Sequence, residues 1–128
     1  MNTNTHKNKI LIVEDEIDLR DALVTAFTYE GFSTLVAGDG EEGLSVAEAD
    51  APNLILLDIS MPKMNGLTML KKLRETAWGK DTKVIVMTVL DDLSKVAEVM
   101  DAGGDEYVVK TQVTLTEIVQ KVKHKLDL

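Results

Sequence analysis

The sequence contains no cysteine among its 128 residues and only two prolines and five aromatic side chains. The absence of cysteine excludes a disulfide scaffold, a thiolate metal site and a cysteine nucleophile. Basic residues are also scarce: the chain has 14 Lys and Arg but 22 Asp and Glu, which gives a formal net charge of −8. This balance argues against direct binding to a nucleic-acid backbone, which requires clustered lysines and arginines.

Long apolar segments are missing as well. No apolar run approaches the ~18 residues of a membrane span, and the polar residues 1–8 lack the apolar region of a signal peptide. A hydrophobic fraction of 45% with 28% charged residues is ordinary for a folded domain. We therefore expect a cytoplasmic protein with no membrane insertion, consisting of a flexible tail over residues 1–8 and one domain over residues 9–128.

Short apolar runs alternate with helical patterns along the chain. The runs lie at residues 10–13, 32–37, 54–57, 84–87 and 107–109. Three of them are continuous rather than alternating, as in strands that are covered on both faces. Apolar residues spaced three or four apart predict a helix after each run. Five β-α units in succession indicate a parallel sheet with helices on both faces.

The last two helices have recognisable boundaries. The stripe of the fourth predicted helix consists of Leu93, Val96, Ala97 and Met100. Gly103 follows and is expected to end that helix. The segment 114–117, Thr-Leu-Thr-Glu, has the spacing of a capping box and predicts the start of the fifth helix.

Polar residues follow four of the predicted strands, at the edge where open parallel sheets bind ligands. Glu14 and Asp15 follow the first, Asp58 the third, Thr88 ends the fourth, and Lys110 follows the fifth. Carboxylates sharing one cleft repel one another unless a cation neutralises them, and oxygen ligands without His or Cys favour Mg²⁺ over Zn²⁺. Taken alone, the acidic pair would equally suit the first turn of a helix. A lone carboxylate at the end of a buried strand, by contrast, indicates a function.

The segment 58–66, Asp-Ile-Ser-Met-Pro-Lys-Met-Asn-Gly, closely resembles the phosphoacceptor loop of bacterial response-regulator receiver domains. The acidic pair, the hydroxyl of Thr88, and Tyr107 three residues before Lys110 agree with that family in order and spacing. The resemblance runs from about residue 9 to residue 126. It implies a doubly wound, flavodoxin-like α/β sandwich whose five parallel strands have the order 2-1-3-4-5.

The resemblance also implies how a phosphoryl group would be received. Asp58 would accept it from a phosphohistidine on a sensor histidine kinase or a histidine phosphotransfer protein. Asp15, Asp58 and the main-chain carbonyl of Ser60 would bind Mg²⁺ directly, and Glu14 would do so through water. The chain would then be a stand-alone response regulator in a two-component system or phosphorelay, catalysing only its own phosphorylation and dephosphorylation.

Three further residues would respond to the phosphoryl group, again by resemblance. Lys110 would pair with the phosphoryl oxygens, Thr88 would move its hydroxyl onto the group, and Tyr107 would turn inward behind it. These movements would alter the surface formed by the fourth helix, the fifth strand and the fifth helix. A downstream protein, which the sequence does not identify, would read that surface.

Three positions depart from the family pattern. Thr111 follows Lys110 where receivers usually carry a cis-proline, and a non-proline cis bond costs ~2.5–4 kcal/mol, so we expect a trans bond and an altered loop. Val89 replaces a small residue and should narrow access to Asp58. Leu90 cannot orient an attacking water, which predicts slow loss of the phosphoryl group.

Two other kinds of protein remain as alternatives. A receiver-like module could bind proteins without phosphorylation, although Asp58, Lys110 and Thr88 are all present. A small enzyme could share the topology. A flavodoxin, however, would bind FMN phosphate where Glu14 and Asp15 stand, and their charges would repel it. A haloacid-dehalogenase-type phosphatase would need two aspartates spaced by one residue after the first strand, and the sequence lacks them there.

Overall fold

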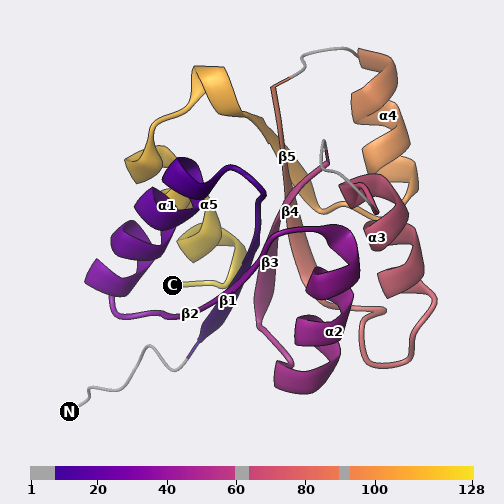
Figure 1. Ribbon diagram of the computed structural model, residues 1–128. Coiled ribbons are helices and arrows are strands. Elements are labelled where there is room, and N and C mark those ends of the chain that lie inside the picture. Colours follow the sequence, from indigo (N-terminus) through magenta and orange to yellow (C-terminus); the bar gives the residue numbers. More distant parts are fainter. Residues whose placement is uncertain (1–7, 60–63, 90–92) are drawn as a thin grey trace.

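The computed structural model describes residues 8–59, 64–89 and 93–128 (Figure 1). The strands are β1 (Lys9–Val13), β2 (Ser33–Ala37), β3 (Leu54–Asp58), β4 (Lys83–Thr88) and β5 (Glu106–Val109). The helices are α1 (Ile17–Tyr29), α2 (Gly40–Asp50), α3 (Gly66–Arg74), α4 (Leu93–Asp101) and α5 (Leu115–Lys125). The expectations for the tail over residues 1–7, for Ser60 and for Leu90 lie outside the described residues.

The strands form one parallel sheet in the order β2-β1-β3-β4-β5, which confirms the predicted topology. Figure 1 shows α1 and α5 on one face of the sheet and α2, α3 and α4 on the other. This order makes β1 and β3 neighbours, with Val13 paired to Leu57. The residues that leave these two strands at their carboxyl ends are therefore brought to the same place.

The continuous apolar runs of β1 and β3 supply both faces of the sheet. Because successive strand residues point to opposite faces, Ile10 and Ile12 enter the core beneath α1 and α5, whereas Leu11 and Val13 enter the core beneath α2 and α3. All four side chains are fully buried. Burial of such a side chain contributes about 1.5–3 kcal/mol, so the two central strands form a rigid support for the residues at their ends.

The ends of the helices follow local sequence signals. The capping box of α5 is confirmed, since Glu117 N donates to Thr114 Oγ1 over 3.1 Å and Thr114 N donates to Glu117 Oε1 over 2.8 Å. The side chain of Asn65 caps α3 by accepting from Thr68 N. The described part of the chain has no cis peptide bond, so the Lys110–Thr111 bond is trans as predicted. A 3₁₀ turn over Lys110–Gln112 forms the altered connection to α5.

The apolar stripe predicted for α4 is only partly correct. The helix ends before Gly103, as expected, and Gly103 has a φ of 103°. However, Ala97 is exposed and Met100 is 44% exposed, whereas Val99, which the predicted stripe omits, is buried. The reason is that α4 covers the β4–β5 edge of the sheet, where Val99 packs into the core beside Val86 and the outer side of the helix has no neighbour among the described elements.

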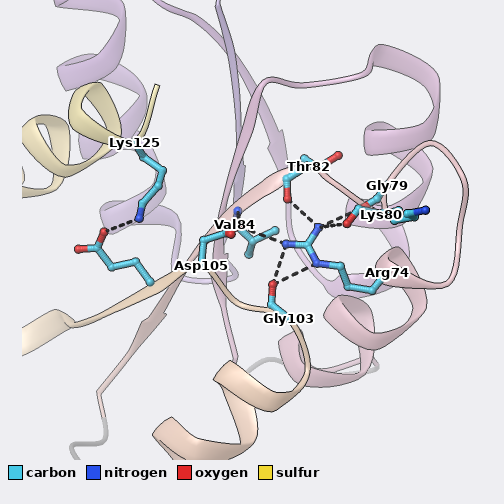
Figure 2. Close-up of polar contacts among 9 residues, drawn as sticks. Arg74, Gly79, Lys80, Thr82, Val84, Gly103, Asp105 and Lys125 are labelled. Atoms are coloured by element: carbon cyan, nitrogen blue, oxygen red, sulfur yellow. Dashed lines mark hydrogen bonds and ion pairs between the residues drawn. The ribbon is translucent and has the colours of Figure 1, made fainter. Parts of the chain in front are cut away.

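Arg74, the last residue of α3, connects three segments at the amino ends of β4 and β5 (Figure 2). Its guanidinium donates to the main-chain oxygens of Gly79 and Thr82 over 2.8 and 2.6 Å, and to that of Gly103 over 2.7 Å. It also pairs with Asp105 at 3.2 Å. Arg74 therefore ties the α3–β4 and α4–β5 connections together, at the opposite end of the sheet from the predicted site.

Candidate functional site

Three carboxylates meet at the carboxyl ends of β1 and β3. One oxygen from each of Glu14, Asp15 and Asp58 lies within 4.8 Å of the others. Glu14 and Asp58 are buried, with exposed fractions of 0% and 2%, whereas Asp15 is exposed. The structure thus brings together the acidic residues that the sequence analysis selected, with one of them open to solvent.

The backbone fixes Glu14 and Asp58 separately. Glu14 N donates to the carbonyl oxygen of Ala37 at the end of β2 over 3.0 Å. Asp58 is the last residue of β3 and pairs with Met87 of β4, and the next residue, Ile59, donates its N–H to Met87 O over 3.2 Å. Because both residues are held at the edge of a packed parallel sheet, their side chains reach the same cleft.

Lys110 supplies the positive charge of this cluster. It follows β5, and its Nζ lies 2.8 Å from Glu14 Oε1 and 3.3 Å from Asp58 Oδ2. Burial alone would lower the pKa of Lys110, but the hydrogen bond to Glu14 and the charges of Asp58 and Glu14 outweigh burial and raise this pKa above its ordinary value. The ammonium group is therefore held in its charged form beside Asp58.

Thr88 and Tyr107 lie on the neighbouring strands. Thr88 is the last residue of β4 and is 3% exposed. It pairs with Val109 of β5, and the residue before it, Met87, pairs with Asp58 of β3. Tyr107 lies on the edge strand β5 and is 36% exposed. A gap too small to hold a water molecule lies under α4, lined mostly by apolar side chains. Its lining includes Ile59, Val86, Thr88, Val96, Val99 and Tyr107. The predicted inward movement of Tyr107 towards Thr88 stays a prediction.

Gly66 has a part in the site that the sequence alone did not reveal. A Cβ atom at this position would lie 2.2 Å from the main-chain oxygen of Asp58 and 2.6 Å from Ile59 Cα. Gly66 N also donates to Ile59 O over 3.2 Å. The first residue of α3 therefore rests directly on the backbone that leaves β3. The Asn-Gly pair at the end of the 58–66 motif is the only sequence signal for this contact.

The donor set fits a hard divalent cation. Glu14, Asp15 and Asp58 carry three negative charges against the single positive charge of Lys110, so the cluster has an excess of negative charge. The Oε1 of Glu14 is buried, and its one partner among the described residues is the ammonium of Lys110. Oxygen ligands with this excess charge suit Mg²⁺.

Comparison with known proteins agrees with this geometry. Residues 10–123 match the family model of the response regulator receiver domain. The chain is 38% identical over 105 residues to a probable transcriptional regulator, ycf27, of Cyanophora paradoxa, covering 82% of this chain and 43% of the relative. It is 33% identical over 115 residues to the response regulator MprA of Mycobacterium leprae, covering 90% and 49%. The chain thus spans less than half the length of these two curated relatives.

Solved structures are similar over nearly their whole length. The CheY-like response regulator receiver domain protein of Methanospirillum hungatei superposes with a TM-score of 0.87 at 32% identity, covering 94% of both chains. A chain of the CheX-CheY-BeF3-Mg²⁺ complex of Borrelia burgdorferi superposes with a TM-score of 0.85 at 30% identity, covering 93% of this chain and 89% of that one. None of the helices in the described segments has the length and apolar character needed to cross a membrane.

Proposed function

The chain belongs to the receiver-domain family of two-component response regulators, and we propose that it is switched by transfer of a phosphoryl group to Asp58. The observation that carries this proposal is the position of Asp58. Its carboxylate is buried at the end of β3, 3.3 Å from the ammonium of Lys110, and within one cluster with Glu14 and Asp15.

The arrangement suits phosphoryl transfer, which depends on positioning and charge neutralisation more than on covalent chemistry of the protein. An oxygen of Asp58 attacks the phosphorus of a phosphohistidine. The P–N bond breaks, its electron pair returns to the imidazole, and an acyl phosphate forms on Asp58. Lys110 then faces the oxygens of the transferred group, and Thr88 at the end of β4 offers its hydroxyl to them.

We propose that Asp15, Asp58 and the main-chain carbonyl of Ser60 hold Mg²⁺ directly, with Glu14 bound through water. When bound, Mg²⁺ neutralises charge that develops on the transferring phosphoryl oxygens. Asp15 is the exposed member of the cluster, so it can admit a cation from solvent. The buried Asp58 is the nucleophile, which its packing at the end of β3 holds in one position.

The implied partners are a sensor histidine kinase or a histidine phosphotransfer protein on the input side and a downstream protein on the output side. We propose that the output surface comprises α4, β5 and α5. It includes the exposed Met100 of α4 and the half-exposed Tyr107 of β5. We further propose that the chain acts in the cytoplasm and that its own phosphorylation and dephosphorylation are its only reactions. A receiver-like module that works without phosphorylation is the alternative.

Incubation with acetyl phosphate and Mg²⁺ followed by intact-mass measurement tests the proposal. The wild-type chain should gain about 80 Da, the mass of one phosphoryl group, and hydroxylamine, which cleaves acyl phosphates, should remove it. Asp58→Asn should gain nothing. Asp81→Asn, which alters an exposed aspartate in the α3–β4 connection, is the matched control and should react like the wild type. No gain in the wild-type protein would favour the phosphorylation-independent module.

A further inference from the structure

We propose that Glu14 is chiefly a positioning residue for Lys110, holding its ammonium group at Asp58, and only secondarily a ligand of the metal. The inference rests on the proposed phosphoryl transfer to Asp58 and deepens it by giving Glu14 a separate role from Asp15. Family resemblance assigns both adjacent acids to the metal, Asp15 directly and Glu14 through water, and gives neither a role towards Lys110. Their surroundings in the structure differ.

The contacts of Glu14 are with the protein. Its Oε1 lies 2.8 Å from Lys110 Nζ, a shorter contact than the 3.3 Å between the same nitrogen and Asp58 Oδ2. Its Oε2 accepts a hydrogen bond from Glu16 N over 3.1 Å, at the start of α1. Each carboxylate oxygen of Glu14 thus already faces a donor of the chain itself.

Burial strengthens the contact between Glu14 and Lys110. The side chain of Glu14 is 0% exposed and that of Lys110 is 13% exposed. Charges interact more strongly in such surroundings than in water, and a buried carboxylate without an opposite charge is strongly destabilised. Asp15, in contrast, is exposed. Of the two adjacent acids, Asp15 is therefore the one available to solvent cations, and Glu14 is the one committed to Lys110.

The strand order explains what this contact achieves. Glu14 follows β1 and Lys110 follows β5, and β3 and β4 lie between these strands. Asp58 ends the intervening β3. The attraction of Glu14 therefore draws the long side chain of Lys110 across β4 and holds its ammonium at Asp58 before a phosphoryl donor arrives. A charge that is already in place needs no reorganisation during the transfer.

A double-mutant cycle separates this role from metal binding. Phosphorylation by acetyl phosphate is measured at saturating Mg²⁺ for the wild type, Glu14→Gln, Lys110→Met and the double variant. Glu14→Gln keeps the shape of the side chain and should slow phosphorylation by about tenfold, within the range of coupled residues. In the Lys110→Met background it should add less than about a twofold effect, because the group that it positions is absent.

Metal affinity and the chemical reactivity of Lys110 provide readouts that do not depend on phosphorylation. Mg²⁺ titration should show a smaller loss of affinity for Glu14→Gln than for Asp15→Asn. In metal-free protein, trace reductive methylation mapped by mass spectrometry should modify Lys110 several-fold faster in Glu14→Gln than in the wild type. Lys95, whose rate should not change, is the internal standard. Asp18→Asn, an exposed acid in the first turn of α1, is the control for charge and should match the wild type.

Two results would overturn the inference. In one, the rate lost in Glu14→Gln returns when Mg²⁺ is raised to saturation. In the other, the effects of Glu14→Gln and Lys110→Met multiply. The first result would mean that Glu14 acts through the metal, and the second would mean that it acts independently of Lys110. A wild-type protein that gains no phosphoryl group would contradict the proposed function instead, and the methylation rates would still decide whether Glu14 holds Lys110.

Discussion

Gly66 and Asp58 touch through their backbones: a Cβ atom added to Gly66 would lie 2.2 Å from the main-chain oxygen of Asp58. This contact places the first turn of α3 against the end of β3, directly beside the carboxylate cluster. Since the neighbouring atoms belong to the backbone of a buried strand, they cannot rotate away as a flexible side chain would. The glycine therefore sets how closely α3 approaches the site.

Gly66→Ala should destabilise the fold and weaken the site together. The added methyl group must displace the backbone of Asp58 or of α3, and forcing extra volume into a packed region costs typically about 1–3 kcal/mol. Urea denaturation should show this loss, and Mg²⁺ titration should show weaker binding. Gly38→Ala is the matched control, because its Cβ would meet nothing closer than 3.7 Å. Equal stability of the two variants would contradict the close approach.

Removal of one carboxylate should change how stability depends on Mg²⁺. Without metal, the cluster of Glu14, Asp15 and Asp58 carries more negative charge than Lys110 neutralises, so Asp15→Asn should raise the melting temperature. With Mg²⁺ at about 100 times its dissociation constant, the wild type should gain about 2.7 kcal/mol by linkage, and Asp15→Asn should gain much less. Thermal unfolding with and without Mg²⁺ measures both effects. A wild-type melting temperature that does not change when Mg²⁺ is added would remove the support for a metal site.

Arg74→Lys should destabilise the protein although it keeps the charge. Lysine cannot reproduce the fork of donors that reaches Gly79, Thr82 and Gly103 (Figure 2). Carbonyls left without donors in partly buried surroundings cost up to about 1–3 kcal/mol each. Because a lysine ammonium can still donate to one of the three, we expect a total loss of about 2–4 kcal/mol. Chemical denaturation measures it. Lys72→Met, on an exposed position of the same helix, should change stability little, and equal losses in both variants would exclude a special role for the guanidinium.

Glu106 should contribute stability that depends on pH. Burial alone would raise its pKa, but hydrogen bonds from Lys121 and Lys125 and their charges lower this pKa below the ordinary 4.5. A carboxylate whose pKa is lower in the folded state stabilises the fold at pH values above its pKa in the unfolded state. This stabilisation is lost as the pH falls through its pKa in the folded state. The stability difference between wild type and Glu106→Gln should therefore be constant near neutrality and shrink below about pH 4.5.

The size of that difference should be modest, less than about 1 kcal/mol, because the ion pairs of Glu106 are partly exposed to solvent. Urea denaturation at a series of pH values measures it. Glu48→Gln, at an exposed position of α2, controls for the loss of one negative charge. A difference that grows as the pH falls would show that the sign of the pKa shift in Glu106 is wrong.

The sequence by itself determined the architecture and the composition of the candidate site. Continuous apolar runs such as residues 54–57 identified strands covered on both faces, and the capping box at Thr114 located the start of α5. These signals are local, since each depends on residues within one strand or one helical turn. Glu14, Asp15, Asp58 and Lys110 could be selected because parallel strands present their carboxyl ends at one edge.

Tertiary structure decided the contacts between segments that are distant in the sequence. The choice of Glu14 as the nearer partner of Lys110 depends on β1 and β5 lying on either side of β3 and β4. The role of Arg74 depends on Gly103, 29 residues away. The exposure of Met100 depends on which part of the sheet α4 covers. Such contacts follow from the distances between packed elements, and no local pattern of residues encodes those distances.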